Sequence, residues 1–201
     1  GYQNDIASNI MFHRWKGASA PGHHVNKFNP TIGSMSKIQV NQSIEPEVYL
    51  SLPADSTVRV QSGNQIEVPL TIIPNDSIIV AGFEFEVEFD TRALKFIDMK
   101  TDVLPGPWMT YVNVHEPIGG WQKVSFGGID YSPNNAPETY HITKEMIGLK
   151  LLFEAEFPEA EELYTAPIKF VGKSAASTPN GEDLVVHKSD GYVEVWNKYW
   201  A

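Results

Sequence analysis

The segment Val80–Asp98, which reads VAGFEFEVEFDTRALKFID, constrains the fold more than any other part of the chain. Large apolar residues alternate there with glutamates, and a period of two places the two kinds on opposite faces of a strand. The apolar set is Phe83, Phe85, Val87 and Phe89, and the acidic set is Glu84, Glu86 and Glu88. Such a strand covers a core with its aromatic face and leaves its acidic face to water or a partner. The segment therefore predicts one strand of a β-sandwich.

Similar short runs recur from Glu47 to Trp196, and turn residues separate them. Ile66–Ile72, for example, alternates strictly between apolar and other residues and stops at Pro74-Asn75-Asp76. Ile142–Ile147 is predicted to form a short helical turn, and no longer helical period is seen. Evenly spaced strands with turn signals are typical of sandwiches and jelly rolls. We therefore expect an all-β chain with a nine- or ten-stranded jelly-roll β-sandwich.

The composition limits the class of protein. The chain has 201 residues, 42% of them hydrophobic, which is ample for one sizeable core. It has no run of 18 apolar residues, so no membrane span is predicted. It has no cysteine, which excludes disulfides, thiolate catalysis and cysteine-ligated zinc. Because it begins with Gly1 rather than Met, we expect a processed product or a piece of a longer protein.

The net charge of −10 is spread unevenly along the chain. Residues 1–45 carry four basic and two acidic side chains, whereas residues 46–201 carry 11 basic and 23 acidic ones. An acidic body repels nucleic acid, so no nucleic-acid partner is expected. The excess of acid serves solubility, or it lets the basic segment dock on an acidic body, its own or a neighbour's.

Residues 1–45 are predicted to form an extended N-terminal arm, and residues 46–201 the sandwich. The first segment is rich in Gly, Pro, Ser and Asn and has no sustained periodicity. It also contains large apolar residues, which disordered tails usually lack. We expect these residues to hold the arm on a surface, either of this sandwich or of another subunit or domain. The candidate partner contacts are Phe12, Trp15 and Phe28.

With these segments laid out, their order resembles that of a cohesin domain. The resemblance spans residues 46–196 and rests on four motifs in order. The first is a pair of alternating strands joined by a glycine turn, and the second is a G-F-x-F strand that ends in Asp. The third is a later strand that begins with Gly, and the fourth is a closing G-x-V-x-V strand. The matching stretches are Val58–Val60 with Gly63, Ile66–Ile72, Gly82–Asp90 with Leu94, Gly148–Phe153, and Gly191–Val195.

The resemblance implies a nine-stranded jelly roll with a non-enzymatic role, in which one flat sheet face grips a dockerin or another protein. The gripping sheet would include Gly82–Phe89, Thr110–Val114, Gln122–Phe126 and Pro167–Val171. Glu84, Glu86 and Glu88 would then point outward from the first of these strands. The 45-residue arm has no counterpart in the family, and the chain lacks a dockerin-type calcium repeat, so it would be the receptor rather than the ligand.

Candidate catalytic and metal-binding residues are few. The six histidines lack the spacing of a metal site, and no G-x-S-x-G motif of a serine nucleophile is present. Glu84, Glu86 and Glu88 share one face of a strand instead of opposing each other across a cleft, as glycosidase acids do. We therefore expect these glutamates to form a charged contact strip or a solvated face. We expect no enzyme activity. Calcium is the more plausible ion, because oxygen ligands gather in two loops, although Asn-rich turns have the same composition. The first loop offers Asp130, Asn134, Asn135 and Glu138, and the second Asn180, Glu182 and Asp183.

Aromatic residues near loops suggest an alternative partner. Trp108, Trp121 and Tyr131 could stack on sugar rings if their rings were exposed and coplanar, or they could cap the ends of the sandwich. The leading hypothesis is a structural, protein-interaction module that works through its arm and an exposed sheet face in an extracellular, cell-surface or virion-like assembly. Its partner would be a protein, by self-assembly or as a dockerin-like module. The alternatives are a carbohydrate-binding module for a polysaccharide and a dockerin-binding receptor domain.

Overall fold

The structure is a computed structural model, and it describes residues 45–75, 78–133, 137, 141–156 and 163–197. Ile44–Ala201 form one compact unit. The described residues contain eleven strands and no helix. The strands are β1 (Glu47–Ser51), β2 (Arg59–Gln61), β3 (Gln65–Pro74), β4 (Gly82–Asp90), β5 (Leu94–Lys100), β6 (Trp108–Val114), β7 (Trp121–Asp130), β8 (Met146–Ala155), β9 (Leu163–Ser177), β10 (Val185–Ser189) and β11 (Gly191–Trp196).

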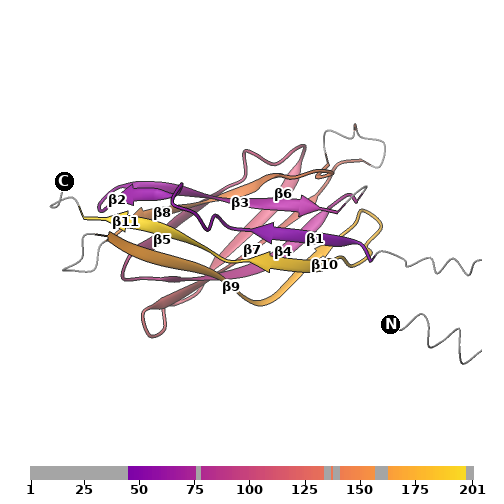
Figure 1. The fold of residues 1–201 in the computed structure, drawn as a ribbon. Coiled ribbons are helices and arrows are strands. Elements are labelled where there is room, and N and C mark those ends of the chain that lie inside the picture. Colours follow the sequence, from indigo (N-terminus) through magenta and orange to yellow (C-terminus); the bar gives the residue numbers. More distant parts are fainter. Residues whose placement is uncertain (1–44, 76–77, 134–136, 138–140, 157–162, 198–201) are drawn as a thin grey trace, which may run out of the picture. The chain divides into compact units, whose positions relative to one another are not determined.

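The strands form two sheets that pack face to face as a sandwich (Figure 1). The five-stranded sheet has the order β10-β1-β3-β8-β5, and the six-stranded sheet has the order β2-β11-β9-β4-β7-β6. Most neighbours run antiparallel, but β1 pairs with β10 and β2 pairs with β11 in parallel. This architecture confirms the predicted all-β jelly-roll sandwich, although the described residues contain eleven strands rather than the nine or ten expected.

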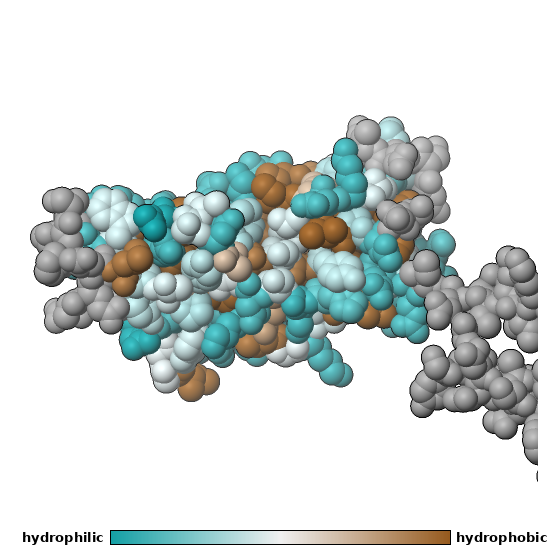
Figure 2. All heavy atoms as spheres, in the orientation of Figure 1, coloured by the Kyte–Doolittle hydropathy of each residue, from teal (hydrophilic) through white to brown (hydrophobic). Residues whose placement is uncertain are grey.

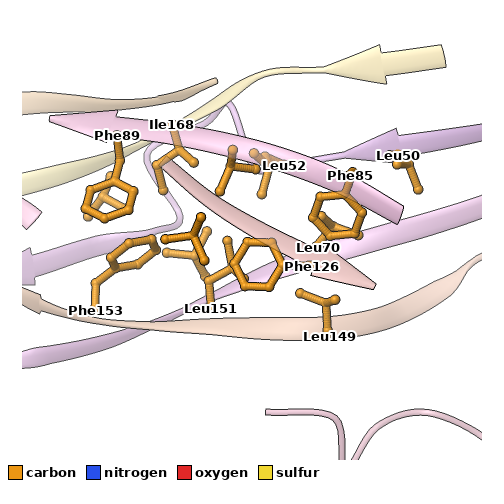
Figure 3. Packing of buried hydrophobic residues seen from close by; sticks show 14 of the residues in the cluster. Leu50, Leu52, Leu70, Phe85, Phe89, Phe126, Leu149, Leu151, Phe153 and Ile168 are labelled. Carbon is orange, nitrogen blue, oxygen red and sulfur yellow. The ribbon is translucent and has the colours of Figure 1, made fainter. Parts of the chain in front are cut away.

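Strand β4 behaves as its period of two predicts. Along it the four apolar residues are almost fully buried, and Glu84 between them is exposed. Phe89 of β4 and Phe153 of β8 point toward each other from the two sheets, with ring centroids 5.0 Å apart and an edge-on angle of 72° (Figure 3). The aromatic face of β4 therefore joins the two sheets through the core.

Two local predictions were wrong or incomplete. Ile142–Ile147 forms no helical turn, because Ile142 makes an isolated bridge to Val80 and β8 has already begun at Met146. The strand expected at Pro167–Val171 is much longer, since β9 pairs first with β11 and then with β4. A register shift opposite Glu84–Glu86 and the left-handed Gly172 interrupt its alternation, which hid its length in the sequence.

Candidate functional site

The outer face of the six-stranded sheet carries the candidate site. Strands β9, β4, β7 and β6 lie next to one another in this sheet, as the cohesin resemblance predicted. Directly opposed residues of an antiparallel pair point to the same face. Glu84 is opposed to Gly127, Glu86 to Ser125 and Glu88 to Lys123. The three acidic residues therefore point away from the core, on the face that the sequence assigned to them.

The middle carboxylate of this row is held by its neighbours. Ser125 donates a hydrogen bond of 2.9 Å to Glu86 Oε1, and Lys123 Nζ lies 3.3 Å from the same oxygen. Burial opposes ionisation of Glu86, but these two hydrogen bonds outweigh it and lower the pKa of its carboxyl. His115 Nε2 lies 2.9 Å from Ser125 Oγ and extends the network to the end of β6. Glu86 is thus a fixed part of the face.

Glu84 has a different environment, next to an aromatic ring. Tyr111 of β6 reaches across Gly127 and hydrogen-bonds Glu84. Gly127 makes room for the ring, because a Cβ atom there would lie 2.1 Å from Tyr111 Cε1. Partial burial, this hydrogen bond and the negative charges of Glu84 and Glu86 together raise the pKa of Tyr111 to about 12. Tyr111 is therefore a neutral donor at physiological pH, and it is oriented by the acid.

An apolar patch adjoins this acid on β6 and β7. Met109 and Ile129 are opposed across the two strands, and each is 54% exposed. Tyr111 is 49% exposed beside them. Tyr131 follows β7, and its hydroxyl donates to Met109 Sδ at 3.6 Å. Large side chains that gather outside the core in this way mark surfaces that bind other molecules.

The outer face of the five-stranded sheet has ion pairs of its own. There Glu67 pairs with Lys100 and with Lys150, whose Nζ is 2.9 Å from Glu67 Oε2. Tyr49 stacks on His187 at 4.6 Å and donates to Glu47. Figure 2, in the orientation of Figure 1, shows one side of the molecule, on which hydrophobic and hydrophilic side chains are interspersed.

The three aromatic residues considered for sugar binding do not form one platform. Trp108 points inward, and its ring packs on Phe83 with centroids 5.4 Å apart. Trp121 lies at the other end of β7, where Lys169 Nζ is 4.9 Å from the ring centroid. Tyr131 alone of the three is widely exposed, at 58%. Because Trp108 packs on the core and Trp121 is separated from Tyr131 by the length of β7, stacking of all three rings along a single sugar chain has no structural support.

Asp130, the first residue of the calcium prediction, ends β7 rather than lying in a loop. Its carboxylate accepts hydrogen bonds from the backbone N–H of Ser132 at 2.7 Å and from His141 Nδ1 at 2.8 Å. Asn180 and Glu182 of the second loop line the same pocket as Asp130. Within the described part of the chain, no group of three or more His, Asp or Glu side chains could hold a metal.

Several predicted site residues lie outside the described residues, so their roles stay predictions. They are Phe12, Trp15 and Phe28 of the arm and Asn134, Asn135 and Glu138 of the calcium loop. The division at residue 45 likewise stays a prediction. Conversely, sequence reasoning missed Met109, Tyr111 and Ile129 as candidate contacts. The one signal in the sequence that could have indicated them is the lack of charged residues in β6, because an uncharged strand can expose apolar side chains on its outer face as well as bury them on its inner face.

Comparisons with known proteins find similarity in three-dimensional structure but not in sequence. No protein-family model matches the chain, and no curated protein matches it in sequence. A chain of a type I cohesin–dockerin complex from Clostridium thermocellum is similar, with a TM-score of 0.58 and 15% identity over 75% of this chain and 94% of that one. The described chain has a cohesin-like fold.

Two further cohesins have the same fold. The cohesin module of a family 33 glycoside hydrolase from Clostridium perfringens has a TM-score of 0.54 and 15% identity, over 77% of this chain and 98% of that one. A non-cellulosomal cohesin from Archaeoglobus fulgidus has a TM-score of 0.52 and 13% identity, over 74% and 91%. The cohesin-like fold is therefore retained at very low identity. Among the described residues, no helix is long and apolar enough to cross a membrane.

Proposed function

We propose that the chain is a non-catalytic protein-binding module and that its binding surface is the outer face of β9, β4, β7 and β6. The observation that carries the proposal is the apolar patch of Met109, Tyr111 and Ile129 beside the exposed Glu84. Exposed aromatic and sulfur-containing side chains next to a charge are typical of the centre of protein interfaces. These side chains stand on the open face of a sheet, which suits a protein surface better than a small molecule.

A dockerin-like module is the partner that we propose. The support is the fold, because similar solved structures include a type I cohesin–dockerin complex. The placement of the face on the four strands predicted from the sequence also supports it. An extracellular or cell-surface location fits this proposal. A virion-like assembly and a contribution of the arm stay predictions from the sequence. Carbohydrate binding is not proposed, because Trp108 and Trp121 are on opposite faces of the sheet.

Binding to a panel of type I dockerin modules, measured by titration calorimetry on the full chain, tests the proposal. Tyr111→Ala should weaken the complex at least tenfold, which is about 1.4 kcal/mol, since tyrosines are enriched among the few interface residues that carry most of the binding energy. The matched control is Tyr49→Ala, because Tyr49 is 43% exposed on the other sheet. It should change the affinity less than twofold.

Two results would count against the proposal, each against a different part. If no module of the panel binds, the dockerin-like partner is wrong. If a module binds but Tyr49→Ala weakens it as much as Tyr111→Ala does, the assigned face is wrong.

A further inference from the structure

Strand β6 is an edge strand whose open side carries none of the usual protection. It is the last strand of the six-stranded sheet and pairs only with β7 among the described strands. Natural sheets usually protect such an edge with charges, prolines, bulges or shortness, because free peptide groups pair readily with another strand. The sequence of β6, WMTYVNV, has no charge, no proline and no glycine over seven residues.

The other three edges of the sandwich are protected. β2 has only three residues. β5 carries Lys95, Asp98 and Lys100 and has a register shift between Phe96 and Asp98. β10 has five residues and ends with His187-Lys188-Ser189. β6 is thus the exception among the described edges, and its exposed peptide groups call for a partner.

The hydrogen-bond pattern shows which peptide groups of β6 are free. The N–H of His115 donates to Lys123 O, and the N–H of Tyr131 donates to Pro107 O. Hydrogen-bonded and non-hydrogen-bonded residue pairs alternate along an antiparallel ladder. The backbone N–H and C=O groups of the odd-numbered residues of β6 therefore bond to β7, and those of the even-numbered residues face the open edge. The edge-facing residues are Trp108, Thr110, Val112 and Val114.

The side chains of β6 are as unprotected as its backbone. Val112 and Val114 belong to the core-facing side of the strand, yet they are 40% and 49% exposed. On the outer side lie Met109 and Tyr111 of the apolar patch. An added strand would cover apolar groups on both faces, so burial and hydrogen bonding would act together.

We propose that β6 pairs antiparallel with β6 of a second copy of this chain, which joins two six-stranded sheets into one. The edge is self-complementary when Tyr111 lies opposite Tyr111 of the second copy. In this register Thr110 is opposed to Val112 of the second copy, and every edge-facing peptide group finds a partner.

Charge and position favour a second copy as the occupant. β6 has no charge, so two such strands meet without opposed like charges. The proposed pairing strand, β6, also carries Met109 and Tyr111 of the apolar patch. The pairing therefore places the binding faces of the two copies side by side. Residues 46–201 are strongly acidic overall, so the two bodies repel weakly at long range. Because one strand pair is smaller than a standard interface, we expect a dissociation constant on the order of 10–100 µM.

Sedimentation of the full chain over a range of concentrations provides the first test. The wild type should dimerise reversibly, and about 0.5 M salt should strengthen or preserve the dimer, because salt screens the repulsion between acidic bodies. Val112→Lys should weaken the dimer at least tenfold, since inward-pointing charges block edge pairing. Val185→Lys on β10 is the matched control, because Val185 is 39% exposed, and it should have no effect. Circular dichroism checks that both variants fold.

Cysteine cross-linking tests the register, since the chain has no cysteine of its own. Tyr111→Cys should form a disulfide-linked dimer under mild oxidation. The two copies of residue 111 would form a non-hydrogen-bonded pair, whose Cα atoms lie about 4.5 Å apart, within the range that a disulfide spans. Asn113→Cys should not, because its two copies would be about 14 Å apart along the strands. The pair Met109→Cys with Asn113→Cys should cross-link again, since these positions are opposed.

The proposal is overturned by three results. The first is a chain that stays monomeric at about 1 mM, well above the expected dissociation constant, and the second is a dimer that Val112→Lys leaves intact. The third is cross-linking of Asn113→Cys as efficient as that of Tyr111→Cys. A dimer that dissociates at high salt and ignores Val112→Lys would instead indicate docking of the basic segment on an acidic body. Partner binding through the face is measured separately, so its failure would not affect this test.

Discussion

Tyr164 of β9 donates a hydrogen bond of 2.5 Å to Oδ2 of Asp90, the last residue of β4. Asp90 is 1% exposed, and Arg92 binds the same carboxylate with its side chain at 2.6 Å and its backbone N–H at 3.0 Å. A buried carboxylate needs such partners, because an unpaired charge there is very costly. The contact fixes the turn between β4 and β5 to a strand that lies far away in sequence.

Tyr164→Phe should lower the free energy of unfolding by about 2 kcal/mol, because it removes a hydrogen bond to a buried charge. Urea denaturation of the full chain measures this change. Tyr192→Phe serves as the control, since Tyr192 lies on the neighbouring strand β11 and is half-buried. A loss of stability as large in the control as in Tyr164→Phe would contradict the assignment.

The same carboxylate makes stability depend on pH. Burial opposes ionisation of Asp90, but the hydrogen bonds from Arg92 and Tyr164 outweigh it and lower its pKa to about 2. The unfolded chain has the ordinary value near 4 and so binds the proton first as pH falls. The stabilisation, roughly 2 kcal/mol, is therefore complete above about pH 5 and is lost as the pH falls towards 2.

Asp90→Asn should be less stable than the wild type at about pH 6, and the difference should shrink towards about pH 2.5. Unfolding by urea at the two pH values gives both numbers. An unchanged difference between the two proteins would show that Asp90 does not titrate as described.

Two neighbouring glycines of β7 should respond differently to the same substitution. A Cβ atom at Gly127 would lie 2.1 Å from Tyr111 Cε1 on the outer face, whereas one at Gly128 would lie 2.7 Å from Phe83 Cζ on the core side. The exposed tyrosine can swing into solvent, but the buried phenylalanine cannot. Gly128→Ala should therefore cost about 1–3 kcal/mol of stability, and Gly127→Ala clearly less. Urea denaturation of both variants makes the comparison.

Gly127→Ala should instead displace Tyr111 from Glu84. In the wild type, nuclear Overhauser contacts should join the Tyr111 ring to the Gly127 Hα protons, and in the variant this proximity should be lost. Binding of a partner at the face should weaken in parallel. A variant that keeps the ring in place would show that the tyrosine does not require glycine at position 127.

The aromatic contact between the sheets should be among the most costly to remove. Phe153→Ala should lower the free energy of unfolding by about 3–5 kcal/mol, because it leaves a cavity opposite Phe89. Leu152→Ala, on the outward side of the same strand, should cost less than half of that. Thermal and urea denaturation of the two variants make the comparison, and equal losses would contradict the inward placement of Phe153.

The strand pattern of this protein could be predicted because its period is local. Phe83–Phe89 alternates with acids, and the structure buries the apolar residues and turns Glu84 to solvent. β9 was predicted at only a third of its length, because its two halves pair with different strands and a bulge at Gly172 shifts the alternation. Ile142 was placed in a turn because its bridge to Val80 is a long-range pairing.

The sequence by itself determined that the chain forms two sheets around an aromatic core and which side of β4 meets that core, because side-chain alternation is fixed by backbone geometry. Tertiary structure decided the surface. It brought Tyr111 across Gly127 to Glu84, gathered Met109 with Ile129 and left β6 at an open edge. These contacts depend on strand order and register, which arise from pairing between distant segments and leave no periodic trace in the sequence.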